Sequence, residues 1–148
     1  MRSIRQTSAA LGVFFLLVVS HHGAAAADPT RALAGTWTGK AAGPQGAPPT
    51  GDLTVTFKSQ AGQLTGRMTV RGQGGTEYSG DVSDVSLRKG VFSATATLML
   101  GENPLVVQVN GPLKRQTIEG TFSVSLKGQK MGDGTCSIVK SPPPKPAP

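Results

Sequence analysis

The chain of 148 residues carries 15 Lys and Arg residues against 8 Asp and Glu, with two histidines and one cysteine. Both histidines, His21 and His22, precede residue 28, so no Ser-His or Cys-His nucleophile can be assembled beyond that point. The same scarcity of histidine and cysteine removes the usual ligands of transition metals, and one cysteine cannot form an intramolecular disulfide. We therefore expect a protein that is not an enzyme, has no cofactor or metal, and is stabilised by burial.

Residues 1–27 have the organisation of a cleavable signal peptide. Arg2 and Arg5 precede an apolar run at 11–19, and the small residues at 25–27 suit signal peptidase. Because the run is too short to span a bilayer, we expect a secreted or periplasmic protein that begins at Asp28 and has no membrane span after cleavage. An uncleaved anchor is the alternative. Removing Arg2 and Arg5 leaves 13 basic and 8 acidic residues.

The mature chain begins with one expected helical turn and one expected strand. Asp28 can cap a turn whose first residue is Pro29. Residues 35–39, Gly-Thr-Trp-Thr-Gly, then predict a strand with Trp37 on its inner face. As the only tryptophan, Trp37 offers the largest apolar side chain, so we interpret it as the core residue that seals one end of the domain. A ligand-stacking role is the alternative.

From Asp52 onward, apolar and polar residues alternate with a period of two, which is typical of half-buried strands. A turn at 59–62 pairs Leu53 with Met68, a bulge is expected near Ser83-Asp84, and residues 127–134 predict a Gly-rich turn. The pattern yields about eight strands in residues 28–140, and residues 141–148 predict a Pro-rich disordered tail. The expected fold class is all-β: an antiparallel up-and-down meander that forms a small barrel, closed or partly open.

Inward positions of this barrel are the candidate interior and ligand contacts. They are Trp37, Val55, Phe57, Met68, Tyr78, Phe92, Leu98, Val107 and Phe122. Cys136 also falls in the apolar phase and is interpreted as a small buried hydrophobe. Glycines at the inward positions 66, 80 and 120 suit strong curvature or a close approach across the barrel. A barrel of eight strands is either filled by side chains or holds one small ligand, and an enclosed apolar void of a few hundred Å³ would favour the ligand.

Gly35-Thr36-Trp37 followed by a β-meander resembles the calycin group of lipocalins and avidins, and residues 62–66 (Gly-Gln-Leu-Thr-Gly) resemble the second hairpin of avidin-type sequences. The resemblance implies a small exported barrel that binds a ligand. It also implies that a basic residue after the last strand, here Lys140, covers the tryptophan. The chain departs from avidins because it lacks the further tryptophans of a biotin site. It departs from lipocalins because no helix follows the barrel.

The charged residues suggest a second class of function. All the carboxylates from Asp52 onward fall at outward or turn positions, which argues against an acid–base pair. Lys58, Arg67 and Arg71 share the outer face of one hairpin and form a candidate basic surface for an anionic envelope polymer or a protein partner. Nucleic acid is disfavoured because that face has no aromatic residues. Two hypotheses therefore stay open: a carrier of a small apolar ligand, and a packed scaffold, such as an inhibitor, that binds through its basic surface.

Overall fold

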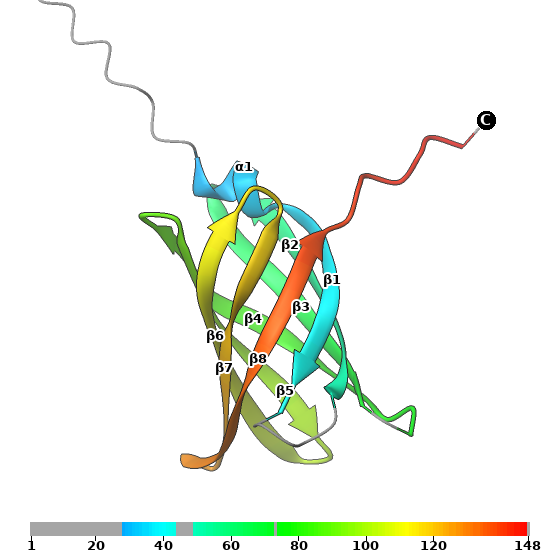
Figure 1. Cartoon of the computed structure of the whole chain (residues 1–148), viewed down its shortest axis with the longest axis vertical. Helices are drawn as coiled ribbons and strands as arrows, with labels where there is room; N and C mark the ends of the chain where they lie inside the picture. The colour runs from blue at the N-terminus through cyan, green and yellow to red at the C-terminus, as the bar shows by residue number, and fades with distance from the viewer. Residues whose placement is uncertain (1–27, 44–48, 73, 148) are drawn as a thin grey trace, which may run out of the picture.

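The computed structural model describes residues 28–43, 49–72 and 74–147, and the predicted signal peptide lies outside them. The described chain forms a closed barrel of eight antiparallel strands in sequence order (Figure 1). Helix α1 (Pro29–Leu33) precedes the strands, which are β1 (Gly35–Ala42), β2 (Pro49–Gln60), β3 (Gln63–Gly72), β4 (Glu77–Arg88), β5 (Val91–Leu100), β6 (Asn103–Lys114), β7 (Thr117–Leu126) and β8 (Gln129–Lys140). The predicted all-β meander is confirmed.

Helix α1 is the short turn that the sequence predicted. The Asp28 side chain accepts a hydrogen bond from the backbone N–H of Thr30 at 3.0 Å, and Pro29 occupies the start of the helix. This is the usual way to satisfy the free N–H groups of a first turn. The helix lies across one end of the barrel, which we call the helix end (Figure 1). The turns at 61–62, 89–90 and 115–116 belong to the same end.

Pairing between the first and last strands closes the barrel. Trp37 lies opposite Lys140, and Ala41 lies opposite Cys136. Every strand therefore has two hydrogen-bonded neighbours, which leaves no edge available for pairing with another chain.

The register of the first hairpin differs from the prediction. Leu53 pairs with Val70 rather than Met68, because β2 and β3 are joined by the two-residue turn Ala61-Gly62. Both turn residues have positive φ, +50° and +76°, a conformation whose twist matches that of the flanking strands. The shift is two residues, so the same side chains still face inward.

The other turn predictions had mixed outcomes. The expected bulge is confirmed: the β4–β5 register shifts between Ser83 and Ser86, with Asp84 at a φ of +52°. The expected long turn at 127–134 is wrong, since β8 begins at Gln129 directly after the turn Lys127-Gly128. Gly132 and Gly134 are strand residues, paired with Val124 and Phe122.

Glycines allow the barrel to curve, and they do so between adjacent strands rather than across the interior. A Cβ atom added to Gly80 would overlap the Thr97 carbonyl oxygen of β5. One added to Gly120 would overlap the Asn110 carbonyl oxygen of β6. These positions therefore bring neighbouring backbones together where the sheet bends, and they do not set aside room for a ligand.

The densest packing lies at the helix end. Trp37, Leu33 and Ile118 are fully buried there. Phe57 meets Phe92 edge to face, with ring centroids 5.8 Å apart. Large side chains from α1 and four strands therefore fill this half of the barrel.

Beyond β8, residues 141–147 form neither helix nor strand and leave the barrel at the helix end (Figure 1). Ser141 still donates a backbone hydrogen bond to Thr36 at 2.7 Å, and the residues after it are exposed. Among the described residues, no helix has the length and apolarity needed to cross a membrane.

Candidate functional site

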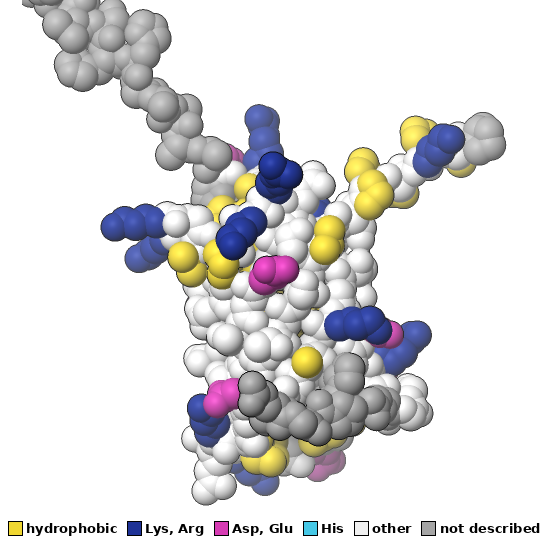
Figure 2. Space-filling model, in the orientation of Figure 1, with side chains coloured by type: hydrophobic (Ala, Val, Ile, Leu, Met, Phe, Trp, Pro, Cys, Tyr) yellow, Lys and Arg dark blue, Asp and Glu magenta, His cyan; other side chains and the backbone are white. Residues whose placement is uncertain are grey.

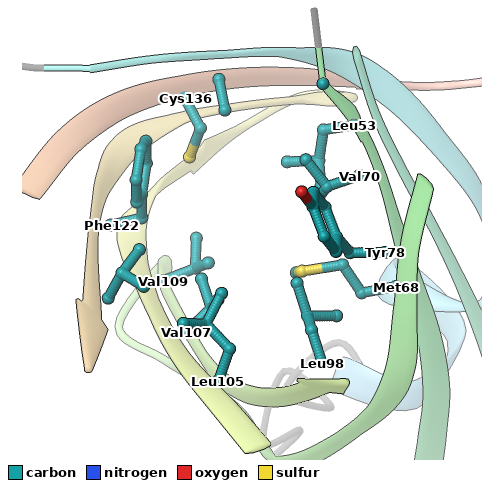
Figure 3. A pocket seen from close by; sticks show the side chains of 13 residues that line it. Leu53, Met68, Val70, Tyr78, Leu98, Leu105, Val107, Val109, Phe122 and Cys136 are labelled. Carbon is teal, nitrogen blue, oxygen red and sulfur yellow. The ribbon is translucent and has the colours of Figure 1, made fainter. Parts of the chain in front are cut away.

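The half of the barrel opposite α1 contains an apolar cavity of about 240 Å³. Figure 3 shows its side chains surrounding a central space. The lining residues come from all eight strands: Ala41, Leu53, Met68, Val70, Gly72, Tyr78, Leu98, Leu105, Val107, Val109, Phe122, Val124 and Cys136. We call this end of the barrel, with the turn residues 74–76, 101–102 and 127–128, the cavity end.

The cavity follows from the sizes of the inward side chains. Both ends use the same inward alternation, but the cavity end supplies mainly valine and leucine and no residue that crosses the interior. No counterpart of α1 or Trp37 fills this half among the described residues. Several lining residues, among them Val70, Tyr78, Leu105 and Val124, are only half buried, which places the cavity within reach of solvent. Apolar side chains that line a space without filling it lose packing contacts, so an apolar ligand can restore them.

The lining carries two side chains with polar hydrogens, the Tyr78 hydroxyl and the Cys136 thiol. Cys136 is 5% exposed. Burial raises the pKa of the Cys136 thiol above its ordinary value, and the hydrogen bond from the Gly120 backbone lowers it by less. The thiol is therefore protonated at neutral pH and is a poor nucleophile. Among the residues that the structure describes, no carboxylate, lysine or arginine lines the cavity. The wall can bind apolar groups and offers few partners to a charged one.

The structure divides the predicted interior residues between the two halves. Five of them line the cavity: Met68, Tyr78, Leu98, Val107 and Phe122. The other four, Trp37, Val55, Phe57 and Phe92, lie outside the lining and belong to the buried core. These four are 0–2% exposed, so they are packed against protein rather than available to a ligand.

The prediction missed several wall residues. Leu53, Val70, Leu105, Val109 and Val124 line the cavity and were not singled out. Each continues the two-residue alternation of its strand, so the signal for an inward position was present. The alternation does not give the position of each residue along the barrel axis, because that position depends on the register between strands.

Trp37 and Lys140 meet at the helix end. The Trp37 indole N–H donates to the Leu33 carbonyl at 2.8 Å, so the buried ring keeps its hydrogen bond. The Lys140 Nζ lies 5.8 Å from the centre of the ring and donates to the Ala32 carbonyl at 3.0 Å. The lysine thus ties the last strand to the end of α1, where basic side chains commonly satisfy free carbonyls.

Two of the three residues of the predicted basic surface form ion pairs with acidic residues. Arg71 forms an ion pair with Glu77 at 3.0 Å, and Arg67 forms one with Asp81 at 3.5 Å. Lys58 is exposed and takes part in none of the ion pairs found among the described residues. The outer face of this hairpin is therefore close to neutral, which weakens the case for a polyanion there.

No protein-family model, curated protein or solved structure matches this chain. Within the part of the chain that the structure describes, no group of three or more His, Cys, Asp or Glu side chains is arranged to hold a metal ion. The cavity and the distribution of charge are therefore the features of this chain that bear on its function.

Proposed function

We propose that this chain is an exported, non-enzymatic binding protein of calycin type that holds a small apolar ligand in the cavity. The observation that supports it is the wall: thirteen residues surround about 240 Å³, and none of them is acidic or basic. A site of this kind gains affinity from apolar burial and offers nothing to activate a chemical bond.

The cavity volume suggests the size of the ligand. A cavity of about 150 Å³ accommodates benzene, so one of about 240 Å³ suits roughly ten non-hydrogen atoms. A small ring system or the end of an alkyl chain fits this description. At about 0.8 kcal/mol per buried CH₂, an eight-carbon chain would bind with a Kd of about tens of micromolar. The Tyr78 hydroxyl and Cys136 thiol can each make one weak polar contact with such a ligand.

Titration calorimetry with straight-chain alcohols from hexanol to dodecanol tests the proposal. Affinity should rise with each CH₂ until the chain fills the cavity, near octanol, and then level off. Repeating the titrations at several temperatures should give a negative heat-capacity change, the signature of apolar burial. Absence of heat and of any melting shift at millimolar octanol would contradict the proposal.

A matched pair of variants locates the binding. Val109→Phe places a larger side chain in the cavity wall, whereas Val139→Phe makes the same change at a residue that is 47% exposed and outside the lining. Val109→Phe should weaken octanol binding at least tenfold, and Val139→Phe should leave it unchanged. Equal affinities in the two variants would show that the alcohol binds elsewhere.

A further inference from the structure

The charges of the barrel are distributed unequally between its ends. At the cavity end, four basic residues (Lys40, Arg71, Lys127, Lys130) are balanced by four acidic ones (Asp52, Glu77, Glu102, Asp133), and Arg67 and Asp81 pair between the two ends. At the helix end, seven basic residues face three acidic ones. The basic residues are Arg31, Lys58, Arg88, Lys89, Lys114, Arg115 and Lys140, and the acidic ones are Asp28, Asp84 and Glu119.

None of the salt bridges found among the described residues involves a basic residue of the helix end, although the hydrogen bonds from Thr30 and the nearby Arg31 lower the pKa of the Asp28 carboxyl. Every ion pair found among the described residues lies at the cavity end or midway: Lys40–Asp52, Arg67–Asp81, Arg71–Glu77 and Lys130–Asp133. Six of the seven basic side chains at the helix end are exposed, Lys140 being the exception over Trp37. Figure 2 shows Lys and Arg side chains gathered around this end. The tail that carries Lys145 leaves from the same place.

These six residues, which we call the basic rim, stand on separate projections around one end of the barrel. Arg88-Lys89 and Lys114-Arg115 occupy the β4–β5 and β6–β7 turns, Lys58 lies near the β2–β3 turn, and Arg31 lies on α1. A single-stranded polymer is usually held along a groove with aromatic residues beneath its bases. The rim has no exposed aromatic residue, because every described Trp, Tyr and Phe is buried or half buried. Cations arranged around one end of a barrel can instead contact a flat surface at the same time.

The rim also has an exposed apolar residue beside the β4–β5 turn. Val91 directly follows the Arg88-Lys89-Gly90 turn and is 49% exposed. An anionic bilayer provides both the flat surface and the complementary charge.

We propose that the basic rim docks this protein on an anionic bilayer surface, with the cavity end facing away from the lipid. The attraction is electrostatic and acts within a Debye length of about 8 Å at physiological salt. Each Lys or Arg near such a surface strengthens binding about fivefold. The rim therefore gives reversible attachment without any membrane-spanning segment, and it makes no use of the ligand cavity.

Vesicle co-sedimentation of residues 28–148, which contain the whole barrel, tests this proposal. Vesicles of phosphatidylcholine alone are compared with vesicles containing about one third phosphatidylglycerol, each at 50 and 500 mM NaCl. The protein should sediment with the anionic vesicles at low salt, and its partition coefficient should fall at least tenfold at high salt. Equal sedimentation with both lipids, or none with either, would overturn the proposal.

Two variants with the same net charge separate the rim from a general effect of charge. The rim variant is Arg88→Gln, Lys89→Asn, Lys114→Gln and Arg115→Asn, with asparagine at the two positions of positive φ. The control variant removes four cations from the cavity end: Lys40→Gln, Arg71→Gln, Lys127→Asn and Lys130→Gln. Circular dichroism and melting should show both folded, since all eight positions are exposed.

The rim variant should lose roughly a hundredfold or more in partition onto anionic vesicles, while the control variant loses less than about tenfold. Equal losses would show that net charge alone drives binding and would refute docking through the rim. Preferential binding of the wild type to a soluble anionic polysaccharide, with competition that strips it from vesicles at low concentration, would indicate a polymer as the partner and also overturn the proposal.

Discussion

The helix end and the cavity end are built from the same strands and the same alternation, yet one is filled and the other is hollow. At the helix end, α1 lies across the barrel, and Leu33 and Trp37 are fully buried. At the cavity end, valine and leucine, together with Met68, Tyr78, Phe122 and smaller residues, line about 240 Å³ without filling it. The difference teaches that a two-residue period specifies which residues face inward, whereas the sizes of those residues decide whether a barrel has a cavity.

The two ends also contribute differently to the stability of the barrel. Large buried aromatic residues and a buried hydrogen bond hold the helix end together, so the cavity end can carry unfilled apolar surface. The unfilled cavity lacks packing contacts, and the packing of the helix end offsets that loss. Four experiments test this difference between the two ends; the first should change stability most and the last least.

The largest effect is expected for Trp37→Ala at the helix end. The substitution removes a fully buried ring and the hydrogen bond to Leu33. Truncating a buried tryptophan costs roughly 3–5 kcal/mol, a large share of a domain's stability, so the variant should be unfolded or close to it. Urea denaturation followed by circular dichroism measures this. A midpoint close to that of the wild type would show that the helix end does not depend on Trp37.

A second pair compares equally buried aliphatic residues in the two halves. Ile118 is 0% exposed and lies outside the cavity lining, and Leu98 is 2% exposed and lines the cavity. Such truncations to alanine cost about 2–5 kcal/mol. We expect Ile118→Ala near the top of this range and Leu98→Ala near the bottom, because Leu98 already lacks neighbours on its cavity side. If denaturant unfolding showed equal losses, the two halves would be equally well packed.

A third, smaller effect is expected for Lys140→Ala. The ammonium group over the Trp37 ring contributes about 0.5–1 kcal/mol, and its contact with the Ala32 carbonyl adds a hydrogen bond. The free energy of unfolding should therefore fall by about 1 kcal/mol, far less than for Trp37→Ala. Tryptophan fluorescence should stay blue-shifted, because the ring remains buried. A loss as large as that of Trp37→Ala would make the lysine, rather than the indole, the main element of this end.

The smallest effect concerns Cys136 and alkaline pH. Burial raises the pKa of its thiol in the folded chain, so the folded state keeps the proton where the unfolded state loses it. The thiol's contribution is fully present below the ordinary thiol pKa and is lost as the pH rises through the raised value. Between pH 7 and 10, the stability of the wild type should fall more steeply than that of Cys136→Ala. Parallel slopes would show that the thiol is not desolvated.

Much of the fold could be predicted from the sequence because strand alternation and turn residues are local signals. The capped turn at Asp28, the bulge near Asp84 and the eight-stranded meander are all confirmed. Registers were harder: a two-residue and a four-residue turn keep the same residues inward, so the pattern around Ala61-Gly62 could not distinguish them. The Gly-rich start of β8 appeared to be a turn because glycine suits bulged strands as well as loops.

The sequence left two outcomes open for the barrel interior: it could be filled by side chains, or it could contain a cavity. Met68, Tyr78 and Leu98 were expected inside the barrel with Phe57 and Phe92, and nothing local separated the two groups. Their positions along the barrel axis depend on how all eight strands are offset. The charge contrast follows from the meander itself, since Arg88-Lys89 and Lys114-Arg115 occupy alternate turns at the same end, next to the paired strands β5 and β6.

The most direct test of the account is to observe which methyl groups respond to an apolar ligand. Octanol would be titrated into protein with ¹³C-labelled methyl groups, and the resonances followed by two-dimensional NMR. We predict that Met68, Leu98 and Val107, which line the cavity, shift progressively and saturate, while Val55, Ile118 and Ile138 do not move. Shifts spread evenly over both halves, or confined to the exposed Val91 and Val139, would contradict a ligand site in the hollow half of the barrel.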